Sequence, residues 1–171
     1  TSAPIRNDDE WGEIDLATAS FGQGIAIPPI QMIRAVAAIA NGGEMVEPRV
    51  VKELVDITGR RIPFKKKRTR RVISEASARV VTEMMIAAVE RGEAKWAKPK
   101  GYRIAGKTGT AQIPVAGHYD ASKTIASFVG FAPADNPKFI MLVTLREPSS
   151  SRWGSETAAP LFFTIAKDLF S

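Results

Sequence analysis

Two stretches of the chain repeat apolar residues at the spacing of a helix. Over residues 30–40 the apolar positions fall on one helical face, the prolines at 28 and 29 precede them, and Asn41-Gly42-Gly43 follows. Proline suits the first turn of a helix and glycine its end, so a helix is predicted here. A second helix is predicted from Ser74, which can cap it, to Gly92.

The second half of the chain carries the pattern of strands. Three are predicted at about residues 102–113, 124–132 and 138–146, and their short connections favour antiparallel pairing. The later two are apolar on both faces, which predicts a sheet covered on both sides. A last helix, started by Ser155 with Glu156, supplies part of that cover. The fold class is therefore α/β of the α+β type, with an antiparallel sheet packed between helices.

Smaller elements are predicted between and before these. The valine-rich alternation at 49–57, a turn at 58–60 and a return at 61–64 indicate a small β-hairpin over about residues 49–64. Residues 1–11 are typical of an irregular lead-in, and residues 16–20 of a short ordered turn.

Composition excludes several kinds of chemistry. The chain has no cysteine and a single histidine, His118, so disulfides, thiol nucleophiles and histidine-rich metal sites are excluded, and neither a metal nor a cofactor is predicted. No apolar run is long enough to span a membrane. The net charge of +6 is concentrated in a basic run at 65–71, which we interpret as a solvated loop. Nucleic-acid binding is not predicted, because no aromatic residues interleave with the run.

The candidate chemistry lies in the polar, glycine-flanked residues 106–111 of the first predicted strand. At a sheet edge, free backbone groups there could pair with an extended peptide, while Lys107 attracts a carboxylate and the hydroxyls of Thr108 and Thr110 donate to it. Alternation places Lys107 and Gly109 on one face and the two threonines on the other. We expect Lys107 and Thr110 to serve the cleft, Gly109 to clear space and Thr108 to support. An exposed edge strand with a solvated lysine is the alternative.

Several linked motifs resemble one protein family. Gly106-Lys107-Thr108-Gly109-Thr110-Ala111-Gln112 is followed by Ala126-Ser127-Phe128-Val129-Gly130-Phe131-Ala132-Pro133 and by Ala158-Ala159-Pro160, and the segments at 17–24, 29–31 and 40–43 precede them. In this order and spacing they resemble the C-terminal half of the transpeptidase domain of a class B penicillin-binding protein. The resemblance covers the chain from about Asp15 onward.

This resemblance implies a fold, an activity and partners. It implies that residues 1–171 are the C-terminal portion of a penicillin-binding transpeptidase domain, a partial β-lactamase/transpeptidase-like fold. The activity would be peptidoglycan D,D-transpeptidation through a serine acyl-enzyme at the outer face of the cytoplasmic membrane, with the anchor outside this chain. The implied partners are the D-Ala-D-Ala stem peptide, β-lactams, the missing N-terminal part of the same protein and morphogenetic membrane proteins.

The resemblance also implies roles for individual residues. Of the superfamily's three motifs, a Ser-x-x-Lys nucleophile, a Ser-x-Asn element and Lys-Thr-Gly, only the third is found here, as Lys107, Thr108 and Gly109. These three residues and Thr110 would bind substrate, and Lys107 and Thr110 would take part in catalysis. Because the nucleophile is absent, this chain alone is predicted to be inactive. Two explanations remain open: a fragment of a longer enzyme, or a short non-catalytic protein that binds peptidoglycan or acts as a scaffold.

A few other residues receive smaller interpretations. The sequence Thr164-Ile165-Ala166-Lys167 imitates part of the nucleophile motif but lies in the predicted last helix, so we interpret it as coincidence. His118 is predicted to lie in a loop near the cleft, where we interpret it as solvated; a substrate-facing histidine is the alternative. Arg152 and Trp153 are candidates for the border of the cleft, but a surface tryptophan packed on its own loop is the preferred interpretation. Gln112 is a candidate for orienting the strand.

Overall fold

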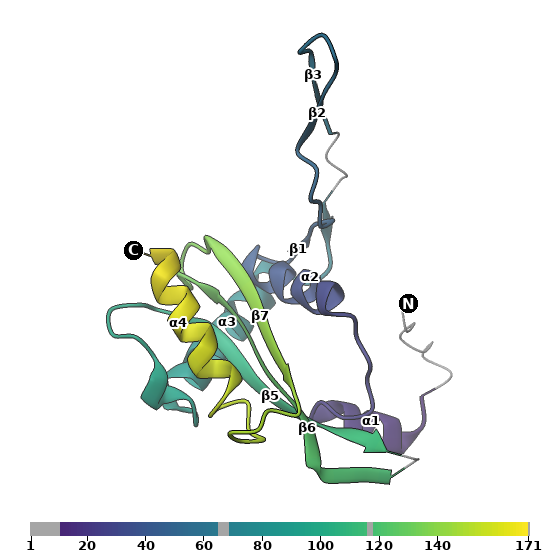
Figure 1. Cartoon of the computed structure of the whole chain (residues 1–171), viewed down its shortest axis with the longest axis vertical. Helices are drawn as coiled ribbons and strands as arrows, with labels where there is room; N and C mark the ends of the chain where they lie inside the picture. The colour runs from purple at the N-terminus through teal and green to yellow at the C-terminus, as the bar shows by residue number, and fades with distance from the viewer. Residues whose placement is uncertain (1–10, 65–68, 116–117, 171) are drawn as a thin grey trace.

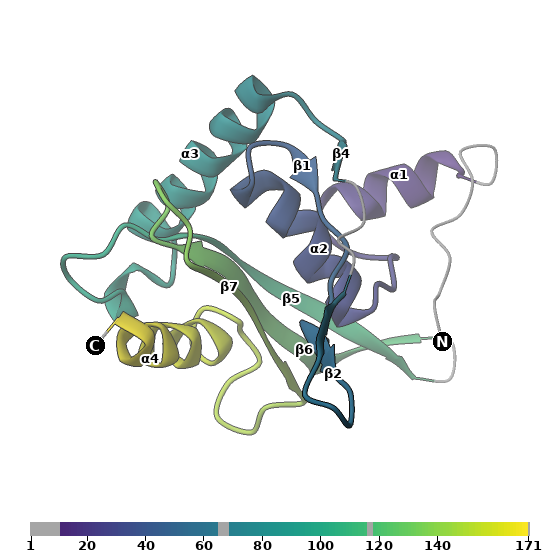
Figure 2. The same cartoon turned by 90° about the horizontal axis from the view of Figure 1, so that it is seen from above.

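A computed structural model describes residues 11–64, 69–115 and 118–170. Its centre is a three-stranded antiparallel sheet of β5 (Ala105–Val115), β6 (His118–Ala132) and β7 (Phe139–Arg146), in the order β5-β6-β7. Helices α2 (Pro29–Ala40) and α3 (Glu75–Arg91) lie on one side, and α4 (Ala158–Phe170) lies on the other (Figures 1 and 2). The predicted architecture, an antiparallel sheet packed between helices, is confirmed.

The two helices predicted from periodicity form for the expected local reasons. Pro29 occupies the first turn of α2, and the helix ends at Asn41. At the start of α3 the hydroxyl of Ser74 accepts a hydrogen bond from the backbone N–H of Ser77, which satisfies one of the free donors of the first turn. Gly92 ends α3, where a Cβ would lie 2.2 Å from the carbonyl oxygen of Ala88.

The core lies on both faces of the sheet. On the α4 side, Phe128 of β6 packs against Phe162 and Phe163, with ring centroids 4.7 and 5.2 Å away. On the other side, Phe131 packs with residues of α2 and α3 such as Val36 and Ile86. Because β6 is covered on both faces, its apolar residues do not alternate with polar ones.

Three details differ from the sequence-based predictions. Residues 13–20 form a helix, α1 (Glu13–Ser20), where only a short turn was predicted. The last helix begins at Ala158 rather than at Ser155, because the Ser155 hydroxyl donates to Glu93 instead of capping α4. Strand β6 begins at His118, so this residue lies in a strand and not in a loop.

The small hairpin is present but shorter than predicted, and it projects from the body of the molecule (Figure 1). It consists of β2 (Glu53–Val55) and β3 (Arg61–Pro63), with Leu54 opposite Ile62. At its base β1 (Glu44–Met45) pairs with β4 (Arg70–Arg71). In the basic run, residues 65–68 lie outside the described residues, as do residues 1–10 of the predicted lead-in. A short 3-10 helix (Lys95–Ala97) follows α3.

Candidate functional site

The strand that carries the candidate motif, β5, lies at one edge of the central sheet as described. Lys107 is opposite Val129 and Thr108 is opposite Phe128. Val129 packs with the α2 and α3 cluster, whereas Phe128 packs against α4. The predicted alternation, with Lys107 and Gly109 on one face and the two threonines on the other, is therefore confirmed. The strand shifts register between Gln112 and Ile113, beyond the motif.

The two glycines of the motif are explained by β6. A Cβ at position 106 would lie 2.4 Å from the ring of Phe128, and one at position 109 would lie 2.5 Å from the hydroxyl oxygen of Ser127. Both distances are too short for a carbon contact, so glycine lets β5 lie close to β6. We expected Gly109 to clear space for a ligand, but in this structure the Ser127 hydroxyl fills that space.

A loop before α4 is fixed to the strand by the motif itself. The N–H of Gly154 donates to the hydroxyl oxygen of Thr110 at 3.1 Å, and the hydroxyl of the buried Thr124 donates to the carbonyl oxygen of Arg152 at 3.0 Å. Arg152 in turn stacks on the ring of Trp153, with its guanidinium carbon 4.6 Å from the centroid. Thr110 therefore holds the aromatic loop against β5.

Replacing Gly154 with alanine is expected to destabilise the chain by about 1–3 kcal/mol. A Cβ at this position would lie 2.5 Å from the Gly109 carbonyl oxygen and 2.6 Å from that of Ser127, and backbone atoms cannot move aside as a side chain can. Urea unfolding checks the stability, and hydrogen exchange at residues 106–111 checks whether the strand loosens. An unchanged unfolding midpoint would show that the loop is not packed on the strand.

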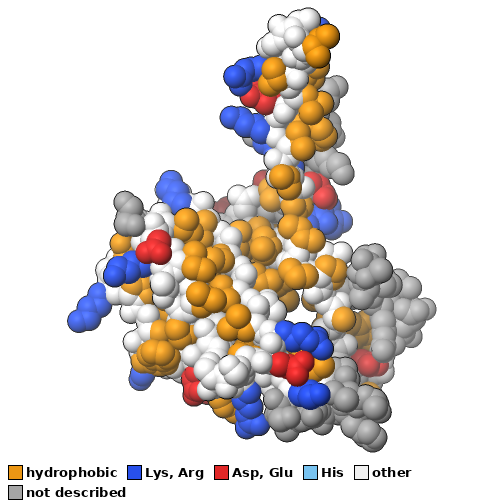
Figure 3. Space-filling view, in the orientation of Figure 1, with side chains coloured by type: hydrophobic (Ala, Val, Ile, Leu, Met, Phe, Trp, Pro, Cys, Tyr) orange, Lys and Arg blue, Asp and Glu red, His pale blue; other side chains and the backbone are white. Residues whose placement is uncertain are grey.

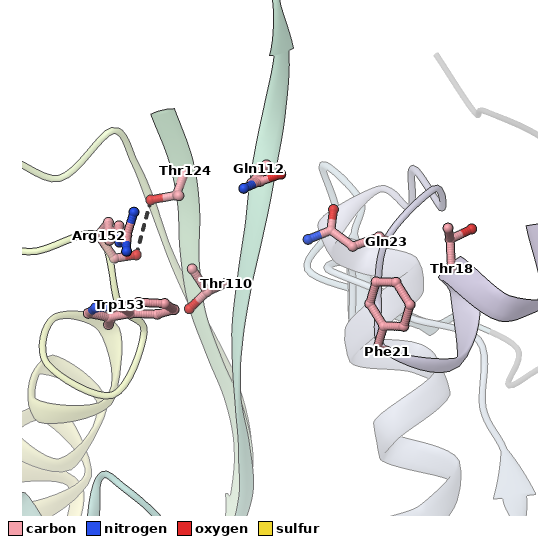
Figure 4. A pocket seen from close by; sticks show the side chains of 8 residues that line it. All are labelled: Thr18, Phe21, Gln23, Thr110, Gln112, Thr124, Arg152 and Trp153. Atoms are coloured by element: carbon pink, nitrogen blue, oxygen red, sulfur yellow. Dashed lines mark hydrogen bonds between the residues drawn. The ribbon is translucent and has the colours of Figure 1, made fainter. Parts of the chain in front are cut away.

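The larger pocket lies between this strand and the end of α1. It encloses about 450 Å³, and Figure 4 shows Thr110, Gln112 and Thr124 between the Arg152 and Trp153 loop on one side and the segment after α1 on the other. The last turn of α1 contributes Thr18, and the segment after it contributes Phe21 and Gln23. Hydroxyl, amide and guanidinium groups line this pocket together with two aromatic rings, and no carboxylate among the described residues does.

A smaller pocket of about 280 Å³ contains the other part of the motif. Lys107 and Thr108 line it beside Glu93, at the end of α3. The ammonium of Lys107 donates to the Thr108 carbonyl oxygen at 3.0 Å and contacts its hydroxyl at 3.4 Å. The structure thus does not bring Lys107 and Thr110 into one pocket, although both lie on the same edge strand. Gly109 lines neither pocket.

The start of β5 is held in place by charged groups. The guanidinium of Arg103 donates two hydrogen bonds of 2.9 Å to the carboxylate of Glu83 on α3 and forms a further ion pair with Asp135. The hydrogen bond to Glu83, followed by the nearby charge of Asp135, raises the pKa of Arg103 above its usual value. These contacts fix the motif strand to α3, although each pair is exposed and stabilises only modestly.

Sequence reasoning found part of this site. Gln112 lines the larger pocket, and so do Arg152 and Trp153, for which packing of the tryptophan on its own loop had been the preferred interpretation. Thr124 and the lining residues from α1 and the segment after it were missed. The glycines at 22 and 24, with positive φ angles of 84° and 76°, mark a tight local turn that presents Gln23. In the sequence, the two glycines around Gln23 were the pattern that could have identified this side of the pocket.

Two absences concern the described part of the chain. No group of three His, Asp or Glu side chains there could hold a metal ion. No helix within residues 11–64, 69–115 and 118–170 is long and apolar enough to cross a membrane. Thr164 and Lys167 lie on α4, and the Thr164 hydroxyl donates to the Pro160 carbonyl oxygen of the same helix, as expected for a coincidental match.

A family model described as the penicillin binding protein transpeptidase domain matches residues 3–169. The chain belongs to this family. Among curated relatives it is 37% identical to the stage V sporulation protein D of Bacillus subtilis over 163 residues, which is 92% of the chain and 25% of that protein. It is also 37% identical to a probable peptidoglycan D,D-transpeptidase, PenA, of Neisseria meningitidis, over 96% of the chain and 27% of the relative.

Solved structures of this family share the fold. The apo form of penicillin-binding protein 3 of Mycobacterium tuberculosis matches with a TM-score of 0.87 and 35% identity, over 96% of this chain and 40% of that chain. The same protein complexed with ampicillin matches with a TM-score of 0.88 at the same identity, over 96% and 39%. Our chain thus spans about a quarter of the length of these two curated relatives, and two fifths of this structural relative.

Proposed function

We propose that residues 1–171 are the C-terminal portion of the transpeptidase domain of a peptidoglycan D,D-transpeptidase and form one wall of its active site. The observation that carries the proposal is the position of Lys107 to Thr110 on the free edge of β5, between two pockets. An extended peptide can pair with the N–H and C=O groups of such an edge. Membership of the family supports the same reading.

In the proposed reaction a serine outside residues 1–171 attacks the D-Ala-D-Ala bond of a stem peptide. The acyl-enzyme then passes to an amine of a neighbouring strand, and β-lactams acylate the same serine. Here Lys107 supplies positive charge for the substrate's terminal carboxylate, Thr108 and Thr110 supply hydroxyl groups, and a backbone N–H of β5 stabilises the tetrahedral oxyanion. The aromatic loop at Trp153 borders the substrate on the α4 side of the strand.

The proposal also includes a location and partners for the whole protein. We place the domain at the outer face of the cytoplasmic membrane, with the anchor outside this chain, where the stem peptide and morphogenetic membrane proteins are available. The missing N-terminal part supplies the Ser-x-x-Lys and Ser-x-Asn motifs. The absence of both motifs from residues 1–171 is a property of the sequence.

The proposal is tested on a longer chain that includes the residues upstream in the reading frame. A fluorescent penicillin should label this longer chain stoichiometrically, and a donor stem peptide with an acceptor amine should give the cross-linked product by mass spectrometry. A longer chain that contains Ser-x-x-Lys, folds and still takes no label would refute the proposed activity. An upstream frame without that motif would favour the non-catalytic binding module instead.

A further inference from the structure

The small β-hairpin at residues 49–64, here called the projecting hairpin, is not used by the proposed reaction. It extends away from the sheet and its helices, far from the candidate site (Figure 1). An isolated two-stranded hairpin is at best marginally stable in water. Because this hairpin has no core of its own, we expect a surface outside the described chain to cover it.

The projecting hairpin exposes apolar side chains on both of its faces. Leu54 lies opposite Ile62 on one face, and the next residue, Val55, points to the other. Ile57 at the tip is fully exposed. The complete exposed apolar set is Val50, Val51, Leu54, Val55, Ile57, Ile62 and Phe64. Such a cluster marks a surface that is buried against something else.

The projecting hairpin carries four basic and two acidic side chains, and the basic run that follows it, up to residue 71, adds six more basic side chains. Between residues 49 and 71 there are ten basic and two acidic side chains, a net charge of +8, whereas the whole chain carries +6. The rest of the chain is therefore slightly acidic, at −2. Six of the ten basic residues belong to the described structure, namely Arg49, Lys52, Arg60, Arg61, Arg70 and Arg71.

The two acidic residues of the projecting hairpin have local structural roles. Glu53 forms an ion pair with Arg61 across the two strands. Asp56 accepts hydrogen bonds from the hydroxyl of Thr58 at 2.7 Å, from its N–H at 2.8 Å and from the N–H of Arg60 at 3.0 Å, which closes the turn. Neither carboxylate forms a described ion pair with Arg49, Lys52 or Arg60, so the hairpin presents positive charge together with apolar surface.

We propose that the projecting hairpin binds the surface of an anionic lipid bilayer, with its tip at the boundary of headgroups and acyl chains and its basic side chains on lipid phosphates. A fluid interface can surround a tip that is apolar on both faces, whereas a groove in a protein covers one face. A soluble polyanion would use the charge but leave the apolar residues exposed. The two open strand edges limit insertion to the interfacial depth. This inference goes beyond the proposed reaction and does not depend on it.

Figure 3 shows how the surface fits such a role. Hydrophobic and basic side chains occur together along the projecting hairpin, which stands clear of the body so that a flat surface can reach it. Each basic residue at the surface of an anionic bilayer increases the binding constant by about a factor of five. Burial of the apolar tip increases the binding constant further. Charge and apolar contact act together, as in other interfacial anchors.

The test uses the 171-residue chain and sedimentation with vesicles of phosphatidylcholine, with or without phosphatidylglycerol. We expect binding to the anionic vesicles only. The triple variant Arg49→Gln, Lys52→Gln and Arg60→Gln should weaken it on the order of 100-fold. A matched triple variant on the body, Arg91→Gln, Lys100→Gln and Lys138→Gln, removes the same charge from other exposed positions and should weaken it far less.

A second pair of variants tests the apolar tip. Val55→Ser with Ile57→Ser should weaken vesicle binding by roughly tenfold, whereas Leu169→Ser on the exposed side of α4 should leave it nearly unchanged. In Ile57→Trp the tryptophan emission should shift to the blue on adding anionic vesicles. Because the hairpin stands off the body, the hairpin variants should keep the thermal unfolding midpoint of the parent. The body variants replace exposed side chains and should change it little.

Three outcomes would overturn the proposal. The first is binding to anionic vesicles that is unaffected by the tip variants and equalled by binding to a soluble polyanion, which would mean charge attraction alone. The second is equal binding of the hairpin and body charge variants. The third is a concentration-dependent dimer, lost in Val55→Ser with Ile57→Ser, which would identify a second copy of the chain as the partner.

Discussion

Replacing Lys107 with alanine in the longer transpeptidase is expected to slow acylation by penicillin by on the order of 100-fold or more. The expectation follows from the usual contribution of a group that stabilises developing negative charge in a site shielded from water. Lys107 is exposed on the edge strand. Its ammonium lies 3.0 Å from the Thr108 carbonyl oxygen, which keeps the positive charge beside the strand, where an anion that pairs with the strand would bind. The measurement is the second-order rate constant for acylation.

The effect should be on the rate and not on the fold. An exposed lysine that donates to an exposed carbonyl contributes little to stability, so the unfolding free energy should change by less than about 0.5 kcal/mol. Lys107→Arg keeps the charge and should recover part of the rate. Lys100→Ala removes an equal charge from the exposed loop that precedes β5 and should leave the rate within about a factor of two. An unchanged acylation rate in Lys107→Ala would show that Lys107 takes no part in the reaction.

The parts of the fold that could be predicted were those specified by local patterns. The helices α2 and α3 have a strong apolar face and local start and stop signals, such as the Ser74 cap. The three strands of the sheet were predicted for similar reasons. In contrast, α1 was missed because it has no buried residue and its apolar side chains Ile14 and Leu16 are exposed, so periodicity gave no core-facing stripe.

Other features depend on residues that are distant in the sequence. The pairing of β1 with β4 joins Glu44 to Arg71 across the whole hairpin, and no local pattern indicates it. Ser155 has the sequence of a helix cap, but its hydroxyl reaches Glu93 in another part of the chain. Both the β1–β4 pairing and the Ser155 hydrogen bond are therefore determined by tertiary contacts and not by local preference.

In the candidate site, too, the features set by local sequence could be predicted and those set by distant residues could not. That residues 106–111 form an edge strand could be predicted, and so could the alternation of its side chains. That Lys107 and Thr110 line different pockets could not, because the walls of those pockets come from the end of α3, the α1 segment and the Trp153 loop. The proposed substrate would have to bridge both pockets along β5, as an extended peptide can.

The 171-residue chain alone is expected to form no stable covalent adduct with a β-lactam. Acylation needs a hydroxyl activated by a neighbouring base, and no Ser-x-x-Lys occurs in the sequence. Two of the three described hydroxyls that line the larger pocket contact the loop, since Thr110 accepts from Gly154 and Thr124 donates to Arg152. The third, on Thr18, donates to the carbonyl oxygen of Ile14 in its own helix. Near Thr108, the Lys107 Nζ donates to the Thr108 carbonyl oxygen at 3.0 Å and to its hydroxyl oxygen at 3.4 Å. In this geometry Lys107 is a donor to the hydroxyl and not an acceptor of its proton.

Intact-protein mass spectrometry after incubation with a penicillin measures the adduct directly. The chain extended upstream through Ser-x-x-Lys is the positive control, and the heat-unfolded 171-residue chain sets the level of non-specific acylation. Thr108→Val serves as a second variant, because it removes the hydroxyl that contacts Lys107. A stoichiometric adduct on the 171-residue chain would contradict the proposal that the nucleophile lies outside it, and loss of that adduct in Thr108→Val would identify the unexpected nucleophile. Absence of an adduct beside full labelling of the extended chain would place the nucleophile upstream and leave β5 with binding and charge stabilisation.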